Sequence, residues 1–431
     1  MAQHAATVDD LLARSPAPDT TARRLEQLQS EADINRRLET LPAESWPDLL
    51  NVIGISSFLF QYLCSHADCV DDFAQPAAQT LAPVAASDFH SLRRHKYRQL
   101  LRLTRLDLNC ADDDYAEILA GLTALAEDVL HKSLELVTAP YDNLPLCIFG
   151  LGKLGAAELN YSSDIDLIFV TQDRGDFADD PDDYQKHVVD CIRHLSRELE
   201  EKTAEGFLYR VDLKLRPWGR SGPMAMSVDQ TEQYYEGTSE SWERFAWLRG
   251  RVVAGSDELG QDLLERLQPF IFSRSLSASD LDRFVQIKND MARHRRRSGC
   301  WDVKVGEGGI RDIEFFVQML QVVNGASHAS LRTTNTLQAL SALTERGFID
   351  TAEAAAIRHS YLFLRRLENR LQMIDERQVH ELPDDKDRRR FLARTLGFAT
   401  DNGDALSDFE DSLMEHQTMA RQCFDKILPE N

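Results

Sequence analysis

Three aspartates on two predicted strands are the residues with the clearest chemical potential in this sequence. Asp164 and Asp166 lie two positions apart around the start of an apolar run, 165–170, so on a strand their side chains share one face. Asp212 lies in a stretch, 207–215, where apolar and mostly polar residues alternate as in a half-buried strand. Neighbouring carboxylates repel each other unless a cation separates them, and Mg2+ prefers oxygen ligands. The aspartates therefore predict a two-metal site that clamps the attacking and leaving oxygens of a displacement at phosphorus, as in nucleotidyl transfer.

A glycine-rich turn, 150–155, precedes the first acidic strand. Gly152, Lys153 and the backbone amides that follow are predicted to hold phosphate, because helix N-termini attract anions. The glycines also spell Gly-x-Gly-x-x-Gly, the dinucleotide fingerprint. That interpretation fails on length, because only residues 156–163 precede the acidic strand and a parallel crossover needs about a dozen. A phosphate-binding loop of the GxxxxGK[ST] type does not occur in the sequence.

A second candidate anion site lies later in the chain. Lys304 and Arg311 flank the glycine pair Gly308-Gly309, whose backbone N–H groups could cradle an anion before a helix. A domain hinge explains the same glycines equally well. The basic run Arg293–Arg297 stands out on an acidic chain, but such a run is usually a solvated helix face.

Composition excludes several classes of protein. The 431 residues carry a formal net charge of −22, which argues against a general nucleic-acid binder. Seven scattered cysteines without a CxxC pair indicate free thiols in a reducing compartment and no zinc site. The first residues lack a leader pattern, and no apolar run approaches the roughly 20 residues of a membrane span. We therefore expect a cytoplasmic protein that contacts neither nucleic acid nor membrane.

Three parts are expected to position these residues. Residues 1–140 read as a helical segment with one amphipathic run near 53–63. Residues 141–275 contain the strands and form the α+β catalytic part, in which 227–254 are predicted to be helical. Residues 276–431 read as a helical bundle with its core face on the helix around 357–374.

Three motifs together resemble one enzyme family. They are the stretches 150–169, 209–217 and 305–315, and they are similar to the bifunctional glutamine synthetase adenylyltransferase/adenylyl-removing enzymes. The resemblance runs through most of the chain and implies a nucleotidyltransferase-like mixed sheet flanked by helices. Members of this family are built of two similar halves, one that attaches AMP to a tyrosine of glutamine synthetase and one that removes it.

The resemblance favours the N-terminal, adenylyl-removing half. Arg311 and the stretch 361–372 are similar to that half. Family members usually continue into a second catalytic half, whereas this sequence ends at Asn431, so it is expected to be an excised half or a short relative. The implied reaction is phosphorolysis, in which inorganic phosphate attacks AMP-tyrosine and yields ADP. Adenylylated glutamine synthetase and the PII signal protein, in its uridylylated form, are the implied partners.

The resemblance also implies roles for individual residues. The three aspartates would bind Mg2+ or Mn2+ as two ions. Gly152, Lys153 and Ser163 would contact phosphates, Arg216 would neutralise developing charge, and Lys304 and Arg311 are assigned to phosphate or nucleotide. Two alternatives stay open: adenylyl transfer from ATP on the same site, and a non-catalytic regulatory module that only binds glutamine synthetase or PII.

Overall fold

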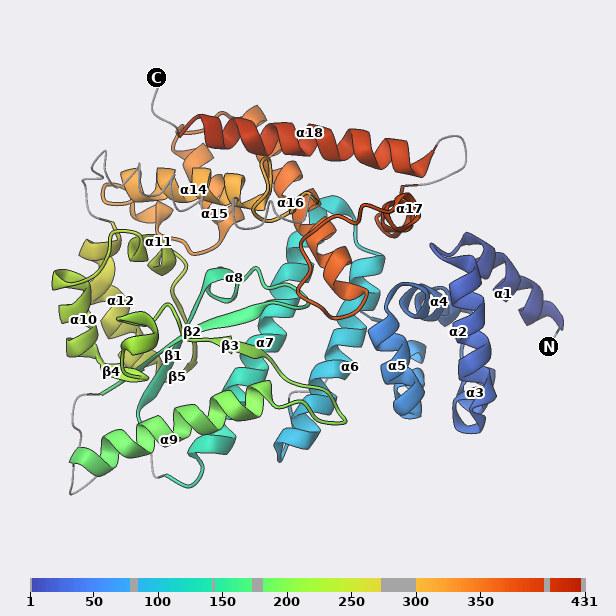
Figure 1. The fold of residues 1–431 in the computed structure, drawn as a ribbon, viewed down its shortest axis with the longest axis horizontal. Coiled ribbons are helices and arrows are strands. Elements are labelled where there is room, and N and C mark those ends of the chain that lie inside the picture. The colour runs from blue at the N-terminus through green and yellow to red at the C-terminus, as the bar shows by residue number, and fades with distance from the viewer. Residues whose placement is uncertain are drawn as a thin grey trace.

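Helices dominate the chain, and a small mixed sheet lies among them (Figure 1). A computed structural model describes residues 2–77, 84–141, 144–172, 181–272, 300–398 and 404–427. The basic run Arg293–Arg297 lies outside the described residues. The architecture confirms the predicted α+β class, with helices on both sides of the sheet.

Seven helices precede the first strand in the described part of the chain: α1 (Ala2–Arg14), α2 (Pro18–Ser30), α3 (Ala32–Glu39), α4 (Trp46–Ile55), α5 (Ser57–Ser65), α6 (Phe89–Leu108) and α7 (Tyr115–Thr138). The expected single run near 53–63 is wrong, because the helix breaks at Ser56. The Ser56 hydroxyl accepts the N–H of Leu59 and so caps α5, and it donates to the carbonyl of Met373. No single described helix is long and apolar enough to cross a membrane. The bent pair Ala43–Ile55 and Ser57–Ser65 is long and apolar enough only when its two helices are taken together.

The middle of the chain forms the sheet and its covering helices. Its elements are β1 (Leu146–Leu151), α8 (Gly152–Gly155), β2 (Asp164–Thr171), α9 (Pro181–Glu200), β3 (Arg210–Asp212), β4 (Ala225–Ser227), α10 (Val228–Gly237), α11 (Glu243–Trp247), β5 (Arg251–Gly255) and α12 (Asp257–Ile271). The strand order is β3-β2-β1-β5, with β4 also paired to β2. β1 runs antiparallel to β2, so the glycine turn joins neighbouring antiparallel strands. This pairing confirms that the dinucleotide interpretation was rightly rejected.

Two sequence expectations about this sheet were wrong. The strand expected over 207–215 is only β3, because the Asp212 carboxylate accepts the backbone N–H of Lys214 and the chain turns there. The stretch 227–254, expected to be helical throughout, ends in β5. β5 pairs with β1, and this long-range pairing outweighs the local pattern.

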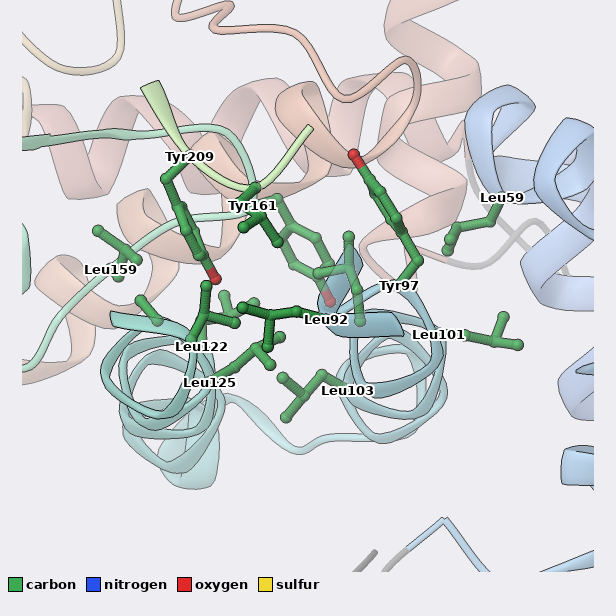
Figure 2. Close-up of a cluster of buried hydrophobic side chains, with 14 of the residues drawn as sticks. Leu59, Leu92, Tyr97, Leu101, Leu103, Leu122, Leu125, Leu159, Tyr161 and Tyr209 are labelled. Atoms are coloured by element: carbon green, nitrogen blue, oxygen red, sulfur yellow. The ribbon is translucent and has the colours of Figure 1, made fainter. Parts of the chain in front are cut away.

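Alternation along the strands separates two apolar cores. Ile165, Leu167 and Phe169 face the core shared with α6, α7 and α9, whereas Ile168 and Val170 face the core under α10 and α12. Figure 2 shows part of the first core, where the rings of Tyr161 and Tyr209 point toward the paired helices α6 and α7 and lie near Leu122 and Leu125. The acidic strand is therefore anchored by apolar side chains opposite to its aspartates.

The last part is the expected bundle: α14 (Ile310–Asn324), α15 (Thr336–Glu345), α16 (Thr351–Met373), α17 (Lys386–Thr395) and α18 (Ala405–Asp425). The expected core face of α16 is buried, from Ile357 to Leu371, while Ile374 lies beyond the helix end and is half-buried. In Figure 1, α16 runs from the bundle toward α6 and α7. Boundaries near residues 140 and 275 stay a prediction.

Candidate active site

A pocket of about 330 Å³ lies between the start of β2 and helix α14. It collects seven of the nine residues predicted from sequence: Gly152, Lys153, Ser163, Asp164, Asp166, Lys304 and Arg311. The other two, Asp212 and Arg216, line an adjoining hollow of about 440 Å³ that shares Asp164 with the pocket. Gly152 and Arg311, 159 positions apart in sequence, thus line the same pocket.

The three aspartates lie where the strand pairing brings them. Asp166 on β2 is the register partner of Asp212 on β3, and Asp164 is the partner of Arg210. The Asp164 carboxylate accepts Arg210 Nε at 2.6 Å, and the Asp212 carboxylate accepts Lys214 Nζ at 2.5 Å. Burial and the negative charge of Asp212 raise the pKa of Asp166 to about 6.

The donor set fits a hard divalent cation in chemistry. The carboxylates of Asp164, Asp166 and Asp212 lie along the paired segments of β2 and β3, which we call the acidic edge. Burial and the negative charges of Asp212 and Asp164 disfavour the ionised form of Asp166, whereas Lys304 and Arg311 favour it. Among the described residues, no three His, Cys, Asp or Glu side chains converge closely enough to hold a metal. Arg210 and Lys214 now occupy two of the carboxylates, and exchange of these part-exposed ion pairs for a cation would cost little.

The glycine turn touches the acidic edge directly. Gly152 has φ +56°, a backbone conformation that disfavours other residues. A Cβ atom at this position would lie 2.6 Å from Asp166 Oδ2. The absence of a side chain at Gly152 is therefore required for the carboxylate to lie where it does.

Lys153 is held by a partner that the sequence did not reveal. Its Nζ lies 2.7 and 2.6 Å from the two carboxylate oxygens of Glu368, on α16. Burial alone would raise the pKa of Glu368, but Lys153 and His380 hold it well below its usual value. Lys153 lines the pocket, yet its charge is already paired.

Lys304 and Arg311 supply the positive side of the pocket. The Lys304 ammonium makes no hydrogen bond or ion pair with the described residues, and burial followed by the charge of Arg311 lowers its pKa. Arg311 Nη1 lies 3.2 Å from Glu314, which also accepts Arg249 Nη1 at 3.1 Å. Burial would raise the pKa of Glu314, but Arg249 and Arg311 outweigh it and lower the value to about 2.

The glycine pair before α14 does not present free amides. Gly308 donates its N–H to Asp312 Oδ2 at 2.9 Å, and Gly309 donates to the carbonyl of Gly306 at 2.9 Å. The next two N–H groups bond Val303 and Lys304 carbonyls. The structural alternative is therefore favoured for the turn, and only the side chains of Lys304 and Arg311 reach the pocket.

Arg216 lies outside the main pocket. Its guanidinium donates to backbone carbonyls of Leu213, Arg220, Gly222 and Pro223. These bonds close the loop after β3. Its role toward developing charge stays a prediction.

Sequence reasoning missed much of the pocket wall. The unexpected lining residues are Leu215, Trp242, Phe245, Ala246, Arg249, Glu314, Phe315, Gln318 and Gln378. Glu314 and Phe315 lie inside the motif 305–315, which was a usable signal. No motif in the sequence marks Arg249, and only the structure shows that it lines the pocket and forms an ion pair with Glu314.

Comparisons with known proteins place most of the chain in described families. The family model described as "Glutamate-ammonia ligase adenylyltransferase" matches residues 46–266, slightly more than half of the chain. A second model, "GlnD PII-uridylyltransferase", matches residues 284–428.

Curated relatives carry the name "Bifunctional glutamine synthetase adenylyltransferase/adenylyl-removing enzyme". The relative from Stenotrophomonas maltophilia (strain R551-3) is 39% identical over 84% of this chain and 41% of its own length. That from Xanthomonas campestris pv. campestris (strain B100) is 36% identical over 92% of this chain and 45% of its own length. That from Hahella chejuensis (strain KCTC 2396) is 33% identical, with shares of 84% and 41%. The chain thus spans less than half the length of these relatives, and it belongs to the glutamate-ammonia ligase adenylyltransferase family.

Proposed function

We propose that this chain removes AMP from a tyrosine of glutamine synthetase by phosphorolysis. The observation that carries the proposal is one pocket in which Lys304 and Arg311 face the carboxylates of Asp164 and Asp166. The Lys304 ammonium and the Arg311 guanidinium would hold an anionic nucleophile, inorganic phosphate, opposite the acidic edge. The carboxylates of that edge would bind metal ions and would not contact the nucleophile.

The proposed step balances without a strong general base. An oxygen of phosphate bonds to the phosphorus of AMP-tyrosine, the bond from phosphorus to the tyrosine oxygen breaks, and ADP and a phenolate result. The phenolate, with a pKa of about 10, takes a proton from water near neutral pH. Lys304 and Arg311 would orient the phosphate and offset its repulsion from the AMP phosphate.

The acidic edge would hold the metal ions. Asp164, Asp166 and Asp212 are the ligands we assign to Mg2+ or Mn2+, in two ions. When bound, such ions supply charge stabilisation for the transferring phosphoryl group. The apolar wall at Trp242 and Phe245 would exclude water from the transferred group, because hydrolysis would otherwise compete with phosphorolysis.

Fewer observations support two further parts of the proposal, that the chain is the adenylyl-removing half and that PII is its partner. Arg311, a second cation beside Lys304, suits a reaction that consumes an extra phosphate. The match of residues 284–428 to a model named for PII-uridylyltransferase supports a link to PII signalling. The relatives' name supplies glutamine synthetase as the protein substrate.

The test is the mass of the glutamine synthetase subunit after incubation with this chain. One reaction contains adenylylated enzyme, Mg2+ and phosphate, and the other contains unmodified enzyme, Mg2+ and ATP, each with and without uridylylated PII. Loss of AMP that requires phosphate, with ADP formed, is expected. Gain of AMP from ATP would instead assign adenylyl transfer, and no change in any reaction would favour a binding module.

A further inference from the structure

Glu368 is a carboxylate buried completely between the bundle and the pocket. Its side chain has 0% exposure, and it contacts Lys153 at 2.6 Å, His380 at 2.9 Å and Arg365 at 3.4 Å. A buried charge is costly to keep unless its partners are held in good geometry. Because Lys153 also lines the pocket, this buried cluster is expected to do more than fill space.

The first consequence concerns the glycine turn. Lys153, which Glu368 holds, directly follows Gly152, and Gly152 lies against the Asp166 carboxylate. A shift of the Lys153 backbone would carry Gly152 with it. The ion pair between Lys153 and Glu368 therefore sets where the turn lies beneath Asp166.

The same helix holds the rest of the loop between β1 and β2. Arg365 donates to Asn160 Oδ1 at 2.6 Å, and Gln372 Oε1 accepts the N–H of Ser162 at 2.9 Å. Tyr361 donates its hydroxyl to Glu158 at 2.7 Å. The four α16 positions, 361, 365, 368 and 372, recur every three or four residues and so lie on one helix face.

Both ends of the β1–β2 loop are therefore fixed by α16. The loop begins at the glycine turn and ends at Asp164, so its path decides the separation between the turn and the acidic strand. The contacts come from an element some 200 residues later in the chain.

We propose that Glu368 is a positioning residue for the carboxylate edge, acting through Lys153 and the glycine turn. This inference rests on the proposed function for the metal ligands at the carboxylate edge and for its turnover readout. Helix α16 would then contribute to the geometry of the site, because its side chains hold the loop between β1 and β2 in place.

The test compares Glu368→Gln with Glu353→Gln, a carboxylate of the same helix that pairs with Lys426 away from the pocket. Mn2+ alone is titrated into each protein by calorimetry, and Asp166→Asn serves as the reference for a lost ligand. We expect Glu368→Gln to weaken Mn2+ binding by about tenfold or more, as loss of a ligand-orienting partner does. In turnover, kcat should fall while KM for phosphate changes little, because no hydrogen bond or ion pair joins Glu368 to Lys304 or Arg311 in the described part of the chain.

A second variant tests the inference if the Glu368→Gln protein does not fold. Lys153→Met/Glu368→Met removes both charges together, so neither member of the pair is left as an unpaired buried charge. It should fold, by helical circular dichroism, and still bind Mn2+ more weakly than the unaltered protein, because the polar anchor is gone. Unaltered Mn2+ affinity and kcat in either folded variant would overturn the inference. If the unaltered protein shows no phosphorolysis but its Mn2+ affinity depends on Glu368, the positioning role stands and the proposed reaction falls.

Discussion

Asp166 on β2 and Asp212 on β3 are register partners in a parallel strand pair, so their carboxylates share one edge of the sheet. Burial and the charge of Asp212 together raise the pKa of Asp166 to about 6. The repulsion between the two carboxylates destabilises the metal-free folded chain, and the same negative charge attracts a cation. Substitutions at this edge and in the pocket beside it should therefore separate effects on stability from effects on turnover.

Replacement of Asp166 by asparagine should abolish phosphorolysis without unfolding the chain. A lost metal ligand removes several kcal/mol of transition-state stabilisation, so kcat should fall by at least about a hundredfold. Turnover is measured as ADP released from adenylylated glutamine synthetase, and folding by circular dichroism. Glu415→Gln, at an exposed site on α18, is the matched control and should retain full activity. Full activity in Asp166→Asn would refute the assignment of this edge.

The same substitution should stabilise the metal-free protein at neutral pH. The pKa of Asp166 is raised in the folded chain, from 3.8 to about 6, so the folded state binds this proton more tightly than the unfolded state. The free energy of unfolding of the unaltered protein therefore falls as pH rises from about 4 through 6. At pH 7.5 in EDTA, Asp166→Asn should be more stable by about 3 kcal/mol, and near pH 4 the difference should vanish. Thermal midpoints at the two pH values decide this, and an equal gain at both would contradict the proposed cause.

Lys304→Met should weaken the use of phosphate while leaving the fold at least as stable. The ammonium has no ion-pair partner among the described residues, so its removal leaves no carboxylate unpaired. Loss of one charge-assisted contact to phosphate, worth about 1.5–3 kcal/mol, should raise KM for phosphate roughly tenfold or more. Lys386→Met, exposed on α17, is the control. An unchanged KM in Lys304→Met would show that phosphate binds elsewhere.

Gly152→Ala should damage the site beyond its backbone strain. The positive φ alone costs about 1 kcal/mol for alanine, but the new Cβ would also lie 2.6 Å from Asp166 Oδ2. Gly347→Ala provides a close control, because Gly347 has φ +74° and its new methyl group would have nothing within 4 Å. Both variants should lose similar stability from strain, while only Gly152→Ala should lose activity and Mn2+ affinity. Equal activity in the two variants would separate the glycine turn from the acidic edge.

Local patterns were enough to locate the acidic edge. The spacing of Asp164 and Asp166, within a run that alternates between two cores, determined their common face through the geometry of a single strand. The short interval after the glycine turn likewise excluded a parallel crossover, as the antiparallel pairing of β1 and β2 confirms. Such features depend on neighbours in sequence, and the sequence therefore determines them.

Tertiary structure alone decided the partners of the charged groups. Lys153 reads as a phosphate ligand beside a glycine turn, yet its charge is paired with Glu368, some two hundred residues away. The glycine pair before α14 reads equally well as an anion cradle or a domain hinge, and only the structure shows that Asp312 accepts the N–H of Gly308. The strength of a charge in a pocket depends on distances and burial between remote segments, which packing creates and which no local pattern encodes.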